Sequence, residues 1–357
     1  MKILTVYGTP QNSGNIFRVR NINNELKKLG NEITEIPPVR RMPLQLNFLY
    51  SIPAYFPYVF NDTYDIVFAS KPYLNATIIA FLKKLQDSKI VADIDDLTFM
   101  YHERGAMRLI LKFFEDILPK YFDLVCVHSK NIGNYMLNHG IKQEKLCYLP
   151  NGVNLSIFNP KLYDKNIYRK KLGLRQEKII LYLANLDISS ELDTILKALK
   201  DIIKSNNVKF VIVGTGVLEN YYKNIVTKMG LKKNVIFTGY VPSKDVPGYI
   251  YAADCCVVYY SNKLANHYRT CLKIREYLAM GKAVVCNDLG DLSNFKDYTF
   301  NFQTENFKQF NDNILQVLNN DIDTKKVIEG QQYIKRNFSW EKIVAEFNKT
   351  LINRLGK

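Results

Sequence analysis

The chain has 357 residues, 47% of them apolar and 13% aromatic, which excludes a disordered chain and predicts two domains, since one core rarely organises this length. The net charge of +15 is scattered, with no block of five or six like charges; this argues against a nucleic-acid-binding tail and fits attraction to phosphates or an anionic membrane surface. The sequence contains no run of 18 apolar residues, so no transmembrane helix is predicted. The six cysteines show no metal-ligand spacing, and we expect buried, reduced thiols in a cytoplasmic protein.

The first 150 residues alternate strand and helix patterns. Short apolar runs predict strands at 2–7, 32–36, 65–69, 89–93, 123–128 and 146–149. Helical spacing predicts helices at 17–29, 74–85, 108–122 and 131–139, and two of them stop at Gly30 and Gly140. Strands that alternate with helices in this way predict βαβ units and a parallel sheet.

A turn-rich segment at 150–160 interrupts the alternation and predicts a connection between domains. The alternation then restarts. We predict strands at 178–183, 209–213, 235–239, 255–259 and 283–286, with helices at 192–205, 218–229, 246–252 and 274–280. A long amphipathic helix is predicted at 340–355. The fold class is therefore α/β with two Rossmann-like domains, at 1–155 and 156–337, followed by a terminal segment at 338–357.

One apolar region, Arg40 to Phe60, has no regular period. It begins with two arginines and contains several prolines and six aromatic residues. Aromatic and cationic side chains are favoured at a membrane interface, so peripheral membrane contact is one interpretation. A buried, irregular excursion beside the first sheet is the other.

Several motifs occur in a characteristic order. They are Pro150-Asn-Gly-Val153 with Phe158 and Pro160, Phe237-Thr-Gly-Tyr-Val241, Tyr251-Ala-Ala-Asp254, Lys273-x-x-Glu276 followed by Gly281, and Phe338-Ser-Trp340. Together they resemble the family-4 retaining glycosyltransferases of the GT-B fold, the glycosyl transferases of group 1. The resemblance implies two Rossmann-like domains that face each other across a cleft, with the acceptor in the first and the sugar nucleotide in the second. It also implies that helix 338–357 crosses back to the first domain.

The resemblance further implies an activity. A hexose-type sugar would pass, with retention, from a UDP- or GDP-linked donor to a hydroxyl of a glycan or lipid-linked acceptor, at the inner face of the membrane if the acceptor is a lipid. No cofactor is implied, and the fold usually works without a bound metal. The sequence leaves two rivals open: a nucleotide-sugar epimerase, and a glycosyltransferase-like subunit without catalysis.

The donor site is predicted around Lys273, Ile274 and Glu276. A carboxylate at Glu276, close to a predicted helix N-terminus, can accept both ribose hydroxyls. The first amides of that helix, with Ile274 among them, suit a diphosphate, and Lys273 adds a cation. The alternatives are that Glu276 is an ordinary acid in the first turn of a helix and that Lys273 is a solvated surface lysine.

Three further donor contacts are predicted. Gly14 follows the first strand, and resemblance places this glycine near the donor diphosphate, where a missing side chain permits close approach. Gly214, in Gly214-Thr-Gly216, is a weak phosphate-loop signal that we interpret as a tight turn near the nucleotide. Val241 would lie beside the base.

The chain departs from the family pattern at three positions. Tyr268 stands where the family has a glutamate that contacts the donor sugar, and Asn185 and Ser190 stand where it has an arginine and a lysine on the diphosphate. Asn185 remains a donor-site candidate, and Arg269 is the preferred replacement cation. The other cations considered are Lys263, Lys273, Arg275 and Lys282.

Three aspartates follow the fourth predicted strand in Asp93-Ile-Asp95-Asp96. Unpaired carboxylates are costly in a core, so Asp95 and Asp96 are predicted to face a site and to orient or deprotonate the acceptor hydroxyl. A metal-bound Asp-x-Asp pair is the alternative interpretation. His128, at the end of the next strand, is expected to be structural.

Overall fold

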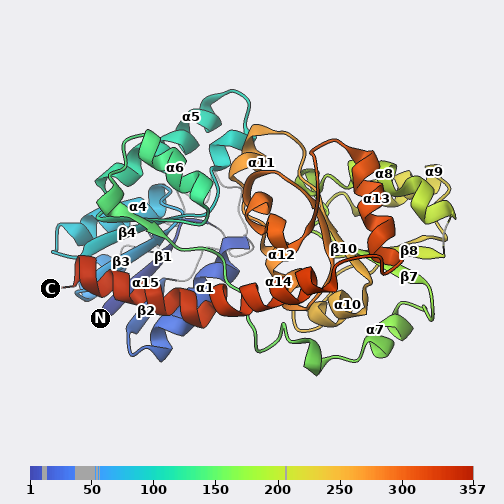
Figure 1. Ribbon diagram of the computed structural model, residues 1–357. Coiled ribbons are helices and arrows are strands. Elements are labelled where there is room, and N and C mark those ends of the chain that lie inside the picture. The colour runs from blue at the N-terminus through green and yellow to red at the C-terminus, as the bar shows by residue number, and fades with distance from the viewer. Residues whose placement is uncertain (10–13, 37–52, 54, 56, 206, 357) are drawn as a thin grey trace. The chain divides into compact units, whose positions relative to one another are not determined.

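The computed structural model describes residues 1–9, 14–36, 53, 55, 57–205 and 207–356, and the chain forms two compact units (Figure 1). Unit 1 contains Met1–Gly152, His267–Thr270 and Trp340–Lys357, and unit 2 contains Val153–Asn266 and Cys271–Ser339. The sequence places the first boundary three residues later, at 155/156. It also assigns the segment His267–Thr270 to the second domain, whereas the structure groups this segment with unit 1.

Unit 1 is built on a six-stranded parallel sheet in the order β2-β1-β3-β4-β5-β6. Its strands are β1 (Lys2–Tyr7), β2 (Glu32–Ile36), β3 (Ile66–Ser70), β4 (Lys89–Ile94), β5 (Leu124–Val127) and β6 (Leu146–Tyr148). The central strands are apolar and buried along their length, as expected of a parallel sheet covered on both faces. All six predicted strands are confirmed.

Helices cover the unit 1 sheet. They are α1 (Gly14–Lys28), α3 (Pro57–Asn61), α4 (Leu74–Lys84), α5 (Ala106–Lys112), α6 (Lys130–Asn138) and α15 (Trp340–Leu355). Shorter turns are η1 (Thr98–Tyr101), η2 (Phe113–Ile117, a π-helical turn), η3 (Leu118–Tyr121) and η4 (Gln143–Lys145). Helices α1 and α15 pack side by side (Figure 1), and Phe347 of α15 meets Phe68 of β3 edge to face at 5.9 Å. The last helix of the chain therefore packs on the first sheet.

Unit 2 has its own six-stranded parallel sheet, in the order β12-β11-β10-β7-β8-β9. Its strands are β7 (Lys178–Leu183), β8 (Val208–Val213), β9 (Val235–Phe237), β10 (Cys255–Val258), β11 (Val284–Asn287) and β12 (Phe300–Phe302). Its helices are α7 (Lys165–Lys171), α8 (Leu192–Ser205), α9 (Glu219–Lys228), α10 (Val246–Ala252), α11 (Leu264–Tyr268, which ends in unit 1), α12 (Leu272–Ala279), α13 (Phe307–Leu318) and α14 (Thr324–Asn337), with short turns η5 (Pro160–Leu162), η6 (Ile188–Ser190) and η7 (Gly290–Tyr298). Strand β12 and helices α7, α11, α13 and α14 were not predicted from the sequence.

Each sheet has one point where the strand order reverses. In unit 1 the chain moves outward from β1 to β2 and then returns to β3 on the other side of β1. In unit 2 the same reversal separates β7 from β10. In open parallel sheets, ligands bind outside the carboxyl ends of the strands at such a switch point. The loops after β1, β3, β7 and β10 are therefore the places to look for a site.

The region predicted to touch a membrane, Arg40 to Phe60, lies mostly outside the described residues. Of its described part, Tyr55 and Val59 are buried in the unit 1 core and Phe60 is exposed. Within the described chain, no helix combines the length and the hydropathy needed to cross a membrane.

Candidate functional site

The switch point of unit 1 brings Gly8 and Lys71 together. The amide of Gly8 donates to the carbonyl of Ser70 at 2.8 Å. A Cβ atom at Gly8 would lie only 1.8 Å from the carbonyl oxygen of Lys71, so a glycine is required for this close approach. Lys71 itself has a left-handed backbone with a φ of 52° and a buried side chain. The turn after β3 thus directs a lysine along the carboxyl edge of the sheet.

Lys71 is the centre of a buried network of charges. Its Nζ lies 2.6 Å from Oδ1 of Asp95 and 3.3 Å from Oε1 of Glu115, and donates to the hydroxyl of Thr98 at 3.0 Å. The hydroxyl of Tyr73 also donates to Glu115, at 2.8 Å. Burial opposes the charge of Lys71, but Asp95 and Glu115 outweigh it and raise the lysine pKa well above its ordinary value. Lys71 is therefore an ammonium ion at neutral pH.

The two candidate acceptor acids, Asp95 and Asp96, differ in their environment. Burial acts to raise the pKa of Asp95, but the adjacent Lys71 ammonium lowers it below its usual value. Oδ1 of Asp96 is buried and has no hydrogen-bond partner in the described part of the chain. Burial and the neighbouring Asp95 charge raise the pKa of Asp96 to about 7. The pair therefore combines one ionised carboxylate with one that can gain or lose a proton near neutral pH.

Asp93 belongs to a separate ion pair. Nη2 and Nε of Arg18 contact its two carboxylate oxygens at 2.9 and 3.1 Å, and both side chains are buried. Burial opposes the charge of Asp93, but Arg18 lowers the carboxyl pKa below its ordinary range. Nε2 of His128 lies 3.6 Å from Asp93, and burial lowers the pKa of this imidazole. Asp93 and Asp95, the pair considered for a metal ion, thus each already face a cation of the protein. His128 packs beside Asp93 and has a structural role.

The segment His267–Thr270 lies next to this edge of unit 1. Asn131 donates to the carbonyl of His267 at 2.8 Å, and the ring of Tyr268 meets that of Tyr135 edge to face at 5.5 Å. The charge of Arg269 acts on Asp96 and opposes the rise in its pKa. Arg269, predicted to contact the diphosphate, is thus a neighbour of the candidate acceptor acid Asp96 within unit 1. Its contact with a donor stays a prediction.

Helix α12 in unit 2 carries the predicted donor site. It begins at Leu272 with Cys271 as its N-cap, two residues before the predicted start, so Glu276 lies in its second turn and not in its first. Ile274 is fully buried in the core, and only its backbone amide in the first turn is suited to the role predicted for it. Nζ of Lys273 lies 4.5 Å from the centre of the Tyr182 ring.

Glu276 is half-buried, and its carboxylate has no hydrogen-bond partner among the residues that the structure describes. Burial raises its pKa to about 7, and the nearby Lys273 opposes this rise. A half-buried carboxylate with a raised pKa and no protein partner is a feature that functional sites often show.

Two cations considered as replacements have structural roles. Arg275 is buried and forms a bidentate pair with Asp291, at 2.8 and 3.2 Å, between the rings of Phe295 and Phe338. Lys282 donates to a backbone carbonyl at 2.7 Å and lies over the Tyr251 ring. Neither is available to a diphosphate, which leaves Lys263, Arg269 and Lys273 as candidates.

The switch point of unit 2 contains an acid that the sequence analysis did not single out. Glu191 follows β7 in a left-handed conformation, with a φ of 54°. Its carboxylate accepts hydrogen bonds from the backbone and hydroxyl of Ser261 after β10, and from Asn266 at 3.0 Å. Lys263 lies 3.7 Å away. Glu191 thus ties together the two loops that define the switch point.

A pocket of about 480 Å³ opens beside Glu191. It is lined by Ile188, Glu191, Asp193, Thr194, Leu218, Tyr221, Tyr222, Ser261 and Lys263. The cations that the family pattern expects in this loop are replaced by residues with local partners. Asn185 is exposed and donates to Asp187 at 2.7 Å, and the hydroxyl of buried Ser190 lies 2.9 Å from that of Tyr222.

The predicted glycine and base contacts differ in how strongly the structure constrains them. Gly214 has a φ of 131°, and a Cβ there would lie 1.9 Å from the carbonyl oxygen of Ala184, so a glycine is required for the loops after β7 and β8 to approach. Val241 is half-buried after β9. Gly14 is exposed at the start of α1, with open space around an added Cβ. Their contacts with a donor remain predictions.

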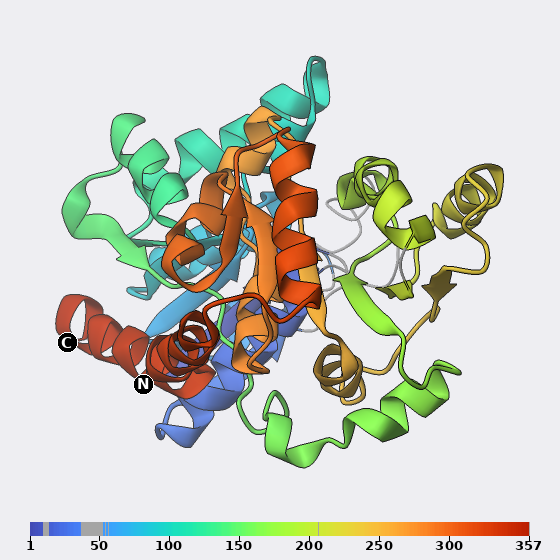
Figure 2. The ribbon, with the colours of Figure 1, turned by 45° about the vertical axis from the view of Figure 1, so that its right-hand side comes forward.

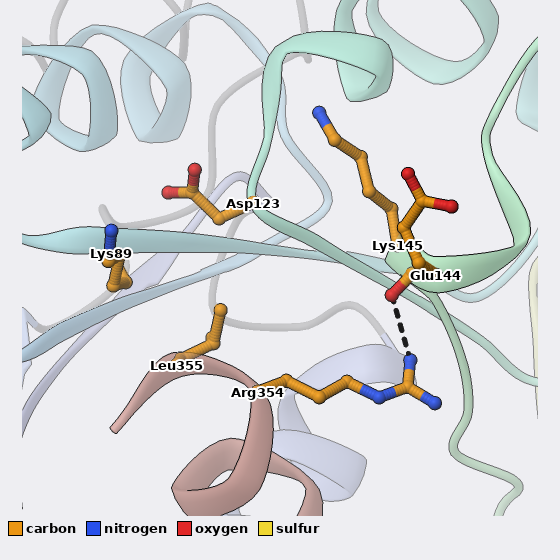
Figure 3. A pocket seen from close by; sticks show the side chains of 6 residues that line it. All are labelled: Lys89, Asp123, Glu144, Lys145, Arg354 and Leu355. Carbon is orange, nitrogen blue, oxygen red and sulfur yellow. Dashed lines mark hydrogen bonds between the residues drawn. The ribbon is translucent and has the colours of Figure 1, made fainter. Parts of the chain in front are cut away.

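A second pocket, at the opposite edge of the unit 1 sheet, is lined by Lys89, Asp123, Glu144, Lys145, Arg354 and Leu355 (Figure 3). Lys89 begins β4, and Arg354 in the last turn of α15 donates to the carbonyl of Glu144 at 3.0 Å. This edge carries the amino ends of the strands, so we assign the pocket to the packing of α15 and not to substrate.

Comparison with known protein families gives a match that lies mostly in unit 2. Residues 164–334 match the family model described as glycosyl transferases group 1. These residues form a group 1 glycosyltransferase domain. The match begins at Asp164, the N-cap of α7, and ends in α14, so it contains α12 and the whole unit 2 sheet.

Curated relatives are similar to the chain over part of its length. One is the UDP-Gal:alpha-D-GlcNAc-diphosphoundecaprenol alpha-1,3-galactosyltransferase of Escherichia coli, 28% identical over 206 residues, which are 56% of this chain and 52% of the relative. Another is the alpha-monoglucosyldiacylglycerol synthase of Streptococcus pneumoniae, 28% identical over 41% of this chain and 33% of the relative. The chain thus spans about half or less of these relatives.

Solved structures match over nearly the whole chain. A sucrose-phosphate synthase from Thermosynechococcus elongatus gives a TM-score of 0.80 at 16% identity, covering 99% of both chains. Anabaena HepE in complex with UDP-glucose gives 0.76 at 16% identity, covering 99% of this chain and 100% of its own. At this identity the likeness concerns the fold, and it confirms the predicted GT-B fold of two Rossmann-like domains.

Proposed function

We propose that this glycosyltransferase moves a hexose-type sugar from a UDP- or GDP-linked donor to a hydroxyl of a glycan or lipid-linked acceptor, with retention of configuration. The observation that carries the proposal is the pair Lys273 and Glu276 on α12, at the carboxyl edge of the unit 2 sheet and within the matched domain. The names of the two curated relatives support a sugar donor and a lipid-linked acceptor.

Unit 2 would bind the donor. Glu276 accepts hydrogen bonds from the two ribose hydroxyls, which supplies the partners that its carboxylate lacks within the described chain. Lys273 and the first amides of α12 hold the diphosphate and stabilise the negative charge that develops on it as the sugar leaves. Gly214 and Val241 lie in loops that would border the nucleotide.

Unit 1 would bind the acceptor. Asp96 can take up the proton of the acceptor hydroxyl near neutral pH, because burial and Asp95 raise its pKa to about 7. Asp95 is held in its ionised form by Lys71 and orients the same hydroxyl. We propose that the diphosphate is held by protein cations without a metal ion. Six free, buried cysteines fit a reducing cytoplasm.

A second candidate is a glycosyltransferase-like subunit without catalysis. It is favoured by Asn185 and Ser190, which supply no charge where the family has two cations, and by the acid Glu191 in the same loop. The two candidates differ in whether the chain binds a nucleotide.

Calorimetry with UDP and GDP distinguishes them. A glycosyltransferase binds one of the two nucleotides, and Glu276→Ala weakens that binding at least about tenfold, the loss of roughly one charge-assisted hydrogen bond. The matched control is Glu329→Ala, which removes an exposed helical glutamate of the same unit and leaves binding unchanged. If the chain binds neither nucleotide, the proposed glycosyltransferase activity is overturned and a non-catalytic subunit is favoured.

A further inference from the structure

The helical segment Ala106–Tyr121 of unit 1 presents an apolar surface to solvent. It consists of α5, the π-helical turn η2 and the turn η3, and it runs along the outside of unit 1 (Figures 1 and 2). Five large apolar side chains on it are strongly exposed: Leu109 (69%), Ile110 (43%), Phe113 (45%), Ile117 (42%) and Tyr121 (61%). We call these five residues the α5 surface. Residues 109, 113 and 117 are four apart, so they share one face.

The opposite face of the segment is anchored, which fixes the α5 surface outward. Leu111 and Phe114 are buried in the unit 1 core. Glu115 is fully buried and binds three groups: the ammonium of Lys71, the hydroxyl of Tyr73 and the backbone amide of Phe99 at 3.0 Å. A rotation that buried Phe113 or Ile117 would expose these contacts. The apolar exposure is therefore a stable property of the fold, and it predicts a partner.

The charges around the α5 surface indicate the kind of partner. Arg104 and Lys120 are exposed, and Lys112 is half-exposed with its ammonium 3.9 Å from Asp116, so cations lie beside the apolar side chains along the segment. The acids of the same segment, Glu115 and Asp116, are buried, and Glu103 is the one exposed acid between residues 103 and 121. Apolar side chains with lysine and arginine beside them match the interface of an anionic bilayer. The bilayer interface takes up the apolar side chains, and its negative charge attracts the cations.

We propose that the α5 surface lies in the headgroup region of an anionic lipid bilayer and brings the acceptor acids of unit 1 to a lipid-linked acceptor. The connection is short, because Glu115 on the inner face of this segment contacts Lys71, and Lys71 contacts Asp95. The lipid-linked nature of the acceptor rests on the proposed function. The α5 surface is a different part of the chain from Arg40 to Phe60, the segment for which the sequence suggested membrane contact.

Vesicle sedimentation tests the proposal with the full chain. The wild type is expected to sediment with vesicles that contain phosphatidylglycerol and much less with pure phosphatidylcholine. The combined variant Leu109→Gln, Phe113→Gln, Ile117→Gln is expected to bind the anionic vesicles at least about tenfold more weakly, since three apolar side chains no longer leave water. The matched control, Leu85→Gln, Ile328→Gln, Ile352→Gln, removes three exposed apolar side chains elsewhere and is expected to bind like the wild type.

Three results would overturn the proposal: wild type that stays in the supernatant with anionic vesicles, a control variant that loses as much binding as the α5 variant, or a lipid-free dimer that the α5 variant abolishes. The last result would show that the surface joins two copies of the chain. Calorimetry with UDP separates this proposal from the proposed function. If the chain binds anionic vesicles through the α5 surface but binds no nucleotide, the membrane proposal stands and the proposed function fails. If it binds a nucleotide but no anionic vesicles, the proposed function stands and the membrane proposal fails.

Discussion

Lys71 is expected to hold together the charged network at the carboxyl edge of the unit 1 sheet, and Lys71→Met tests this. The substitution keeps most of the side-chain volume but removes the ammonium that contacts Asp95 at 2.6 Å and Glu115 at 3.3 Å. Glu115 is fully buried and the Asp95 side chain is only 18% exposed, so both carboxylates would lose their compensating charge. Breaking a buried pair on one side costs about 3–5 kcal/mol. We expect a loss of unfolding free energy in that range.

A double-mutant cycle isolates the interaction. Glu115→Gln keeps the shape and removes one charge, so the double variant Lys71→Met, Glu115→Gln has one uncompensated carboxylate fewer than Lys71→Met. Its loss of stability should be smaller than the sum of the two single losses by at least about 1 kcal/mol. Urea unfolding can be followed through Trp340, the one tryptophan of the chain, which is buried in unit 1.

Additive losses of stability would refute the interaction between Lys71 and Glu115. If the two single losses sum to the double loss within about 0.5 kcal/mol, Lys71 and Glu115 do not stabilise each other. If Lys71→Met alone costs less than about 1 kcal/mol, the buried network does not carry the charge assigned to it.

Three further predictions concern the acids and one glycine. Burial raises the pKa of Glu276 from 4.5 to about 7, so its charge destabilises the fold as pH rises through this range. Glu276→Gln should therefore raise the unfolding free energy by about 1–2 kcal/mol at pH 8, after allowance for the partial exposure of the side chain. Below pH 4.5, thermal unfolding should show no gain from this substitution. If Asp96 accepts the acceptor proton, transfer rates should rise through about pH 7, and Asp96→Asn should abolish that rise and slow transfer by about 100-fold or more; an unchanged profile would exclude the role. Gly214→Ala should cost at least about 2 kcal/mol, because its Cβ would lie 1.9 Å from the carbonyl oxygen of Ala184, whereas Gly14→Ala should change stability by less than about 0.5 kcal/mol; equal effects would contradict the steric argument.

The sequence predicted those features that depend on local pattern. Alternating strand and helix periods were sufficient for both parallel sheets, and the motif around Lys273 and Glu276 was sufficient to locate α12. The start of α12 was placed two residues late, because Leu272 and Lys273 before the periodic stretch carry no start signal. Short β12 went unnoticed for a similar reason, since three residues carry little periodicity.

The residues that the sequence missed depend on contacts between distant parts of the chain. Lys71 reads as an ordinary loop lysine, and its partner Glu115 lies 44 residues later on a helix whose apolar period concealed a buried acid. Glu191 is held by Ser261, 70 residues away, across the switch point of unit 2. Such pairs follow from strand order, which no local pattern specifies. The helix predicted at 108–122 likewise gave no sign of which apolar side chains face solvent.

Sugar transfer is the central claim, and one measurement tests it most directly. The chain is incubated with radiolabelled UDP- and GDP-hexoses and a membrane lipid extract, and both the extracted lipids and the remaining nucleotides are analysed. Label from one donor is expected to enter the lipid fraction, with release of an equal amount of nucleoside diphosphate. Glu276→Ala is expected to reduce both at least about tenfold. Label that stays on the nucleotide for every donor, unchanged or as an epimer, would contradict sugar transfer.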